Sequence, residues 1–186
     1  MRQLKLQVQI SVDGYIAGPN GEMDWMIMDW SEDLVEHVTQ LTDPVGTILL
    51  GRNLAAGFIP HWTAAYNSAE PQPGAEKFVK TPKVVFSRKL KTSEWDNTVL
   101  AKGGLVEEVN KLKQEDGGDI IAYGGGEFVS SLVKEGLIDE YHLLVNPTVL
   151  GSGMPIFEEL EARQELKVKA VKAFDCGITL LCYQPG

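Results

Sequence analysis

Three consecutive glycines, Gly124–Gly126, follow an apolar stretch and precede residues with helical periodicity. Glycine has no Cβ, so the phosphates of a ligand can approach the backbone closely there. The first N–H groups of a helix are unpaired and carry a partial positive charge, which favours an anion at that end. The run matches neither G-x-G-x-x-G nor a P-loop. It therefore predicts a phosphate site, with a tight strand-to-helix turn as the alternative.

Two further apolar stretches end in groups that suit an anion. Residues 48–54 read ILLGRNL, and Arg52 stands just after a glycine, where its guanidinium would meet a phosphate. Residues 84–89 read VVFSRK, in which a hydroxyl and two cations stand together. Such a group suits a ribose 2′-phosphate, whereas a bare ribose is bound by an acidic residue. The alternatives are a surface arginine at a helix start and a solvated strand end.

Each of these three segments directly follows an expected strand. Each follows an apolar segment in a region where strand and helix patterns alternate. The carboxyl ends of parallel strands meet at one edge of a sheet, and ligands bind at that edge. Three anion-binding ends on one edge predict an extended polyphosphate ligand, such as a dinucleotide.

The expected elements define an α/β fold. Alternation of strands and helices predicts a mixed, mostly parallel central sheet with helices on both faces, and the last two strands must form an antiparallel hairpin. Between Pro60 and Thr81, three prolines and a glycine, with Pro82 at the edge, predict a long loop, in which His61 and Trp62 would form a lid. The expected strands are 3–10, 47–50, 83–87, 98–101, 119–123, 140–145, 166–173 and 178–183, and the expected helices are 31–41, one from 52, 105–113 and 124–134.

Composition excludes several classes of protein. The 186 residues, expected to form a single domain over 1–186, carry a formal charge of −9, from 26 acidic and 17 basic residues. A nucleic-acid or anionic-membrane protein needs a basic surface instead. No apolar run is long enough to span a membrane, so we expect a cytoplasmic protein that binds a small molecule. The two cysteines, Cys176 and Cys182, would not face each other across the hairpin, and scattered histidines without a CxxC motif predict no structural zinc site.

The same segments carry a family resemblance over nearly the whole chain. In this order they resemble the dihydrofolate reductase-like superfamily, and they are most similar to the C-terminal reductase domain of the bifunctional riboflavin-biosynthesis deaminase-reductase and its stand-alone relatives. The most specific block is the last long one, in which the glycine run is followed by GLIDEY, a strand, NP and LGSG. The segments are SVDGYIAG (11–18), LLGRN (49–53), VVFSR (84–88), YGGGEFVSSLVKEGLIDEYHLLVNPTVLGSG (123–153) and PIF (155–157).

The resemblance implies the dihydrofolate reductase-like fold, NADPH as hydride donor and a homodimer. By position, it implies phosphate contacts at the turn after the second strand, a 2′-phosphate site after the third strand, a pyrophosphate and ribose cradle at the glycine run, and a nicotinamide near the first loop. In the same order, the residues of these four sites are Gly51, Arg52, Asn53 and Leu54 for the phosphate contacts; Ser87 and Arg88 for the 2′-phosphate; Gly124, Gly125, Gly126, Glu127 and Phe128 for the pyrophosphate and ribose; and Ile16 and Ala17 for the nicotinamide.

Asp33 is the expected catalytic residue, because the active-site acid of dihydrofolate reductases maps onto it across a short insertion. It would relay or stabilise the proton that accompanies hydride transfer, which a carboxyl does near pH 7 if burial raises its pKa. The alternative is an ordinary aspartate in the first turn of a helix. Asp13, Trp25 and Trp30 are expected at the substrate, where aromatic walls suit a planar heterocycle; a turn aspartate and core tryptophans are the alternatives.

Two functions remain open from the sequence. The first is an NADPH-dependent reductase that acts on a small planar heterocyclic or carbonyl substrate. The second is a non-catalytic module with the same fold that binds a nucleotide or other ligand. Leu54 stands where dihydrofolate reductases usually carry a hydroxyl residue, and residues 23–25 read MDW where those enzymes have a proline in the middle. The resemblance therefore does not identify folate as the substrate.

Overall fold

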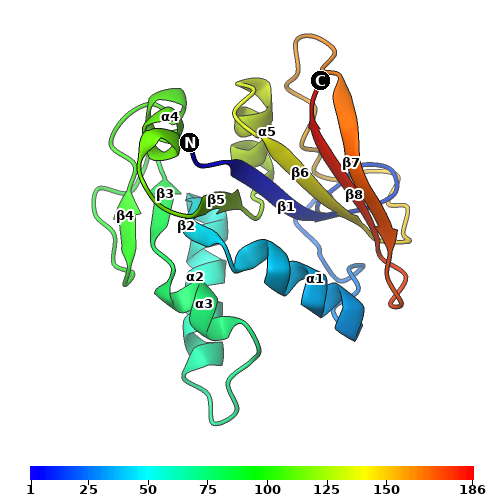
Figure 1. The fold of residues 1–186 in the computed structure, drawn as a ribbon, viewed down its shortest axis with the longest axis horizontal. Helices are drawn as coiled ribbons and strands as arrows, with labels where there is room; N and C mark the ends of the chain where they lie inside the picture. The colour runs from blue at the N-terminus through cyan, green and yellow to red at the C-terminus, as the bar shows by residue number, and fades with distance from the viewer.

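The computed structural model describes all 186 residues, and its eight strands form one sheet in the order β4-β3-β2-β5-β1-β6-β8-β7 (Figure 1). The first six strands of that order are parallel, whereas β8 runs antiparallel to both β6 and β7. The strands are β1 (Leu4–Ile10), β2 (Val45–Gly51), β3 (Lys83–Phe86), β4 (Thr98–Leu100), β5 (Asp119–Ala122), β6 (Glu140–Val145), β7 (Leu166–Ala173) and β8 (Thr179–Pro185). This confirms the predicted mixed sheet with its C-terminal hairpin.

Five helices cover both faces of the sheet, as expected (Figure 1). They are α1 (Glu32–Thr42), α2 (Arg52–Tyr66), α3 (Ala75–Lys80), α4 (Leu105–Gln114) and α5 (Gly126–Lys134). On one face, α4 and α5 pack through Val109 and Leu132 on the strands. On the other, α1 covers β6 and β8, and α2 packs on β2, β3 and β5. None of the helices has the length and apolarity needed to cross a membrane.

Side-chain alternation along β1 shows how the sequence selects these two faces. Leu4, Leu6, Val8 and Ile10 are buried and belong to the core beneath α4 and α5. Because side chains of a strand point alternately to opposite faces, the residues between them face α1 instead. Those residues are polar: Lys5, Gln7 and Gln9. The interface between α1 and the sheet therefore contains a polar layer.

The prediction of a long loop between residues 60 and 81 is wrong. Helix α2 continues through Pro60 to Tyr66, and α3 begins at Ala75, so only the short segment between them is irregular. Proline removes one backbone hydrogen bond from a helix interior. Here packing of Ala55 and Ile59 on the sheet maintains the helix. His61 and Trp62 accordingly lie in α2 and not in a lid loop.

The C-terminal hairpin forms as expected. Cys182 is paired with Ala170, and the register of β7 shifts only beyond that pair, between Val168 and Ala170. Cys176 lies in the turn that closes the hairpin, and both cysteines are free thiols. The two cysteines therefore do not face each other across the hairpin, as expected.

Candidate functional site

The carboxyl ends of four parallel strands form one edge of the sheet, which we call the carboxyl edge. In the order β3-β2-β5-β1, these ends lead into residues 87–88, 51–54, 124–126 and 11–17. The topology thus places the expected cofactor residues side by side, although they are far apart in the sequence. Their individual roles are not tested by this placement and stay predictions.

Contacts between these segments are close. A Cβ built on Gly51 would lie 2.8 Å from the Cβ of Phe128, so α5 packs directly against the end of β2. Leu54 lies next to the glycine run, because a Cβ on Gly125 would be 3.7 Å from the Cβ of Leu54. The ring of Phe128 stacks on that of Phe86, with centroids 5.2 Å apart. Phe128 therefore joins the ends of β2 and β3 to the first turn of α5.

The conformation of the glycine run changes the interpretation of that motif. Gly124 and Gly125 have φ values of +148° and +85°, which residues with a side chain rarely adopt, whereas Gly126 is the first residue of α5. The turn itself therefore requires two of the three glycines. What favours an anion is the helix start that follows, since the first N–H groups of α5 have no intrahelical partner. Glu127, in that first turn, is exposed and would repel a phosphate but suits a ribose hydroxyl.

Cations without a partner lie at the same edge. Arg52 is the first residue of α2, next to exposed Asn53, and Arg88 and Lys89 are exposed beyond the end of β3. None of these three cations belongs to the ion pairs of the structure, which use other lysines and arginines. The Ser87 hydroxyl accepts hydrogen bonds from the Lys89 and Leu90 amides, at 3.1 and 2.9 Å, and so shapes this turn. In a chain of net charge −9, this is a local concentration of positive charge.

A hollow of about 520 Å³ adjoins Arg88, between the end of β3 and the helices α4 and α5. Lys134 and Ser131 line it together with three carboxylates. The carboxylates would repel a phosphate within the hollow, so an anion would bind at its Arg88 side and a neutral sugar or base would enter it. The lining residues are Arg88, Gly104, Leu105, Val106, Glu107, Ser131, Lys134, Glu135 and Glu159.

The loop after β1 is fastened to the segment after β6. Asp13 accepts hydrogen bonds from the Leu150 and Gly151 amides, at 3.1 and 2.7 Å, and from the Ser11 hydroxyl. The Leu150 amide, against a desolvation cost, holds the pKa of Asp13 below its ordinary value, so this carboxylate is charged. Both of its oxygens bind protein groups, which favours the turn interpretation over substrate contact. Ile16 and Ala17 follow, both buried.

Backbone pairing completes this connection. The Ile16 amide donates to the Met154 carbonyl at 3.0 Å, and the Met154 amide donates to the Ala17 carbonyl at 2.9 Å. A Cβ on Gly126 would lie 3.8 Å from the Cδ1 of Ile16. The expected nicotinamide residues therefore lie beside the start of α5.

Asn146, at the end of β6, is a positioning residue that the sequence did not single out. It is fully buried; its Oδ1 accepts from the Ile27 amide at 2.8 Å, and its Nδ2 donates to the Gln9 Oε1 at 3.1 Å. These bonds hold the segment that contains Trp25 and Trp30 over the ends of β1 and β6. The NP pair in the family resemblance was the available signal. Trp30 packs on the core beneath α1, and the Trp25 indole donates to the Glu22 carbonyl.

Asp33 lies in the first turn of α1, near the turn of the β7–β8 hairpin. The Ser31 hydroxyl donates to its Oδ1 at 2.6 Å, and Ser31 also accepts the Cys176 amide at 3.2 Å. The Ser31 bond, with the Asp175 amide and the Lys172 charge, lowers the pKa of Asp33 despite some desolvation. This is opposite to the raised pKa expected of a proton donor. A lowered pKa favours the carboxylate form of Asp33 near pH 7, which suits it to orienting a water, and its catalytic role stays a prediction.

Known proteins share this architecture. A family model described as the RibD C-terminal domain matches residues 2–180. The uncharacterized protein YyaP of Bacillus subtilis (strain 168) is 35% identical over 189 residues, with 98% of this chain and 94% of that protein covered. The riboflavin biosynthesis protein RibD of Aquifex aeolicus (strain VF5) is 25% identical over 198 residues, with 93% of this chain and 54% of that protein covered.

A solved structure extends the likeness to three dimensions. It is a diaminohydroxyphosphoribosylaminopyrimidine deaminase/5-amino-6-(5-phosphoribosylamino)uracil reductase of Thermotoga maritima, which matches with a TM-score of 0.71 at 16% identity and covers 100% of this chain and 57% of that chain. At this identity the likeness shows the fold alone. The family match, in contrast, spans nearly the whole sequence. The chain therefore belongs to the RibD C-terminal domain family, with its dihydrofolate reductase-like fold.

Proposed function

We propose that the protein is an NADPH-dependent reductase that transfers a hydride to a small planar heterocyclic or carbonyl substrate. One observation carries the proposal: the unpaired N–H groups of α5 and the unpartnered Arg52 and Arg88 lie along one sheet edge of an otherwise acidic chain. Membership in a family that includes the RibD reductases supports it.

The residues of the carboxyl edge fit such a cofactor. A phosphate chain would lie across the start of α5 between Arg52 and Arg88, with the 2′-phosphate at Ser87 and Arg88 and the adenosine toward the adjoining hollow. NADPH, when bound, supplies the hydride. The residues proposed to hold it are Ile16, Ala17, Gly51, Arg52, Asn53, Leu54, Ser87, Arg88, Gly124, Gly125, Gly126, Glu127 and Phe128.

At the substrate end, the chain would mainly orient and exclude water. Buried Ile16 and Ala17 provide an apolar wall, and the segment held by Asn146 presents Trp25 on the same side of the sheet edge. Because the pKa of Asp33 is lowered, we assign it the orientation of a water or substrate N–H, with the proton coming from solvent. The class of reaction is reduction of a C=O or C=N bond.

Arg88→Glu tests the cofactor assignment. Loss of a charge-assisted hydrogen bond costs about 1.5–3 kcal/mol, so NADPH should bind at least about tenfold more weakly while NADH changes little. Arg163→Glu makes the same charge change at an exposed residue paired with Glu165, and serves as the control. Tryptophan fluorescence titration measures both affinities. Equal weakening of NADPH and NADH would remove Arg88 from the 2′-phosphate site.

The lowered pKa of Asp33 favours the second candidate function, a non-catalytic module that binds the nucleotide. Oxidation of NADPH in the presence of pterins, flavin precursors and quinones distinguishes the two: tight NADPH binding without turnover of any of them would support the module. The homodimer implied by the resemblance stays a prediction, which sedimentation analysis would test.

A further inference from the structure

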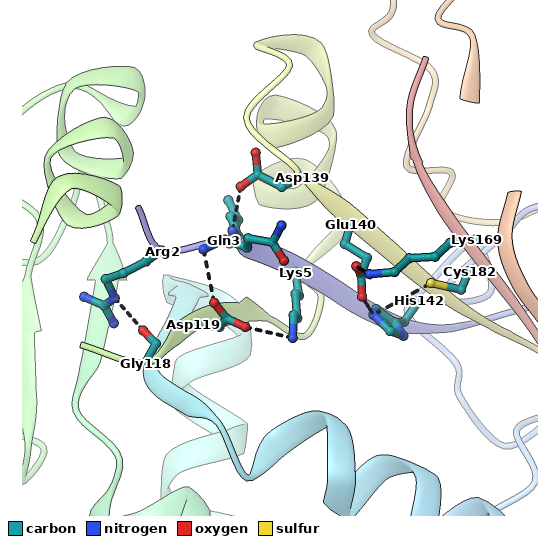
Figure 2. A network of polar contacts seen from close by, with 11 residues as sticks. Arg2, Gln3, Lys5, Gly118, Asp119, Asp139, Glu140, His142, Lys169 and Cys182 are labelled. Atoms are coloured by element: carbon teal, nitrogen blue, oxygen red, sulfur yellow. Dashed lines mark hydrogen bonds and ion pairs between the residues drawn. The ribbon is translucent and has the colours of Figure 1, made fainter. Parts of the chain in front are cut away.

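A cluster of buried side chains with metal-binding chemistry lies between α1 and the sheet, away from the carboxyl edge. Glu140 and His142 occupy alternate positions of β6 and so point to the same face, and Cys182 is the cross-strand partner of His142 on β8 (Figure 2). The Nε2 of His142 lies 2.5 Å from the Oε1 of Glu140 and 4.0 Å from the Sγ of Cys182. All three residues are at most 6% exposed.

The spacing of the three donor atoms suits one ion. One ligand atom from each residue lies within 4.8 Å of the other two. Donors around a tetrahedral Zn²⁺ are roughly 3–4 Å apart, because metal–ligand distances are about 2.0–2.3 Å. Small side-chain rotations would therefore bring a carboxylate, an imidazole and a thiolate to one centre. This mixed set suits Zn²⁺, whereas Mg²⁺ and Ca²⁺ prefer oxygen ligands alone.

Buried polar atoms without a hydrogen-bond partner lie close to the cluster. Three buried side-chain atoms in the chain have no hydrogen-bond partner: the Oε1 of Gln7, the Nε2 of His37 and the Nδ1 of His142. Gln7 is paired with His142 across β1 and β6, and the rings of His37 and His142 are 6.3 Å apart. Native proteins rarely leave buried polar groups unpaired, so this layer favours a further polar or ionic partner. All three converge on the same layer beneath α1.

The charges of the cluster are balanced at present by a lysine. Lys169 forms an ion pair with the Oε2 of Glu140 from the neighbouring strand β7, and its side chain is about half exposed (Figure 2). The flexible Lys169 can leave toward solvent. A dication with two anionic ligands would restore neutrality in its place.

We propose that Glu140, His142 and Cys182 form a binding site for one zinc-class divalent cation between β6, β8 and α1. On binding, the Cys182 thiol loses its proton to solvent, and the Glu140 carboxylate exchanges the Lys169 ammonium for the metal. His37, on α1, is the nearest further imidazole, with its ring centroid 6.3 Å from that of His142, and it would have to move toward the three ligands to supply a fourth. The site joins α1 to the sheet and takes no part in hydride transfer.

Titration of the metal-free protein with Co²⁺ tests this site directly. A thiolate-to-cobalt charge-transfer band and the intense visible bands of tetrahedral Co²⁺ should appear at one equivalent, and Zn²⁺ should abolish them. Cys182→Ser should remove the charge-transfer band and weaken Zn²⁺ binding by about 100-fold or more, a loss at least as large as that for an outer-shell partner. Cys176→Ser, at the other cysteine, in the hairpin turn, should change neither.

Two further variants keep the test decisive if Cys182→Ser fails to fold. Lys169→Ala removes the competing cation from an exposed strand and should tighten Zn²⁺ binding, whereas Lys167→Ala, two residues away on the same exposed strand, should not. Absence of a cobalt charge-transfer band in the wild-type protein would overturn the proposal. So would equal loss of binding in the two cysteine variants, or no effect of Lys169→Ala.

Discussion

Gly51 has no room for a side chain, and Gly51→Ala should therefore destabilise the protein. A Cβ at this position would lie 2.8 Å from the Cβ and 3.2 Å from the Cγ of Phe128. The backbone of Gly51 has φ −72° and ψ 151°, which alanine adopts without strain. The effect of the substitution is therefore a steric one, in which β2 and α5 must separate or Phe128 must leave its position against Phe86.

The expected size of the effect follows from that overlap. An ordinary carbon–carbon contact is about 3.5–4.0 Å, so several tenths of an ångström must be gained at a packed junction. Overpacking of this kind costs about 1–3 kcal/mol in free energy of unfolding. For a chain of this length, 2 kcal/mol corresponds to a decrease in Tm of about 4–8 °C.

Gly57→Ala is the matched control, because no atom lies within 4 Å of a Cβ built there, in the interior of α2. Alanine is favoured over glycine in a helix by about 1 kcal/mol, so this variant should melt a few degrees higher than the wild type. Thermal unfolding followed by circular dichroism, without any ligand, measures both. A Gly51→Ala variant that melts at or above the wild-type Tm would refute the close approach of β2 and α5.

Two other predictions concern groups that the structure places in key contacts. Asn146→Ala leaves the Ile27 amide and the Gln9 side chain without their partner and should cost about 2–4 kcal/mol, seen in chemical denaturation together with altered tryptophan fluorescence; unchanged fluorescence would contradict its role in holding the Trp25 segment. Burial disfavours the Asp119 charge, but hydrogen bonds from Lys5 and the Gln3 amide outweigh it and lower the pKa of Asp119 (Figure 2). Asp119 therefore stabilises the fold above its unfolded pKa of about 3.9, and this contribution disappears as the pH falls through its lower folded value. The stability difference between the wild type and Asp119→Asn should be present at pH 7, decrease as the pH falls below about 4, and vanish only below the lower pKa of the folded protein; a difference independent of pH would be contrary to this reasoning.

Local patterns were sufficient for most of the strands and helices. The alternation of β1 and the apolar runs of β2 and β5 each predict a strand, and the glycine run correctly marks the start of α5. Pro60 was misleading because its local signal is that of a break, whereas packing of Ala55 and Ile59 on the sheet maintains the helix across it. Tertiary burial there outweighs the loss of one backbone hydrogen bond.

The candidate site divides in the same way. That apolar segments end in Arg52, Arg88 and the glycine run is a property of the sequence, and parallel strands must bring such ends to one edge. The lowered pKa of Asp33 was not predictable from the sequence. Its partner Ser31 is only two residues away, but the charge of Lys172 and the Asp175 amide come from the distant β7–β8 hairpin. The role of Asn146 likewise depends on partners more than a hundred residues away.

The sequence could not predict the buried cluster of Glu140, His142 and Cys182 beneath α1, and the reason is physical. Metal motifs are recognised by short spacing between ligands, and Cys182 is 40 residues from His142. Only the antiparallel register of β6 and β8 makes them neighbours, and only the covering helix α1 removes them from water. Residue types and strand patterns thus determined the fold class and which residues gather at the carboxyl edge of this protein. Strand register and helix packing decided which distant side chains share an environment, because contact and burial are properties of the folded chain.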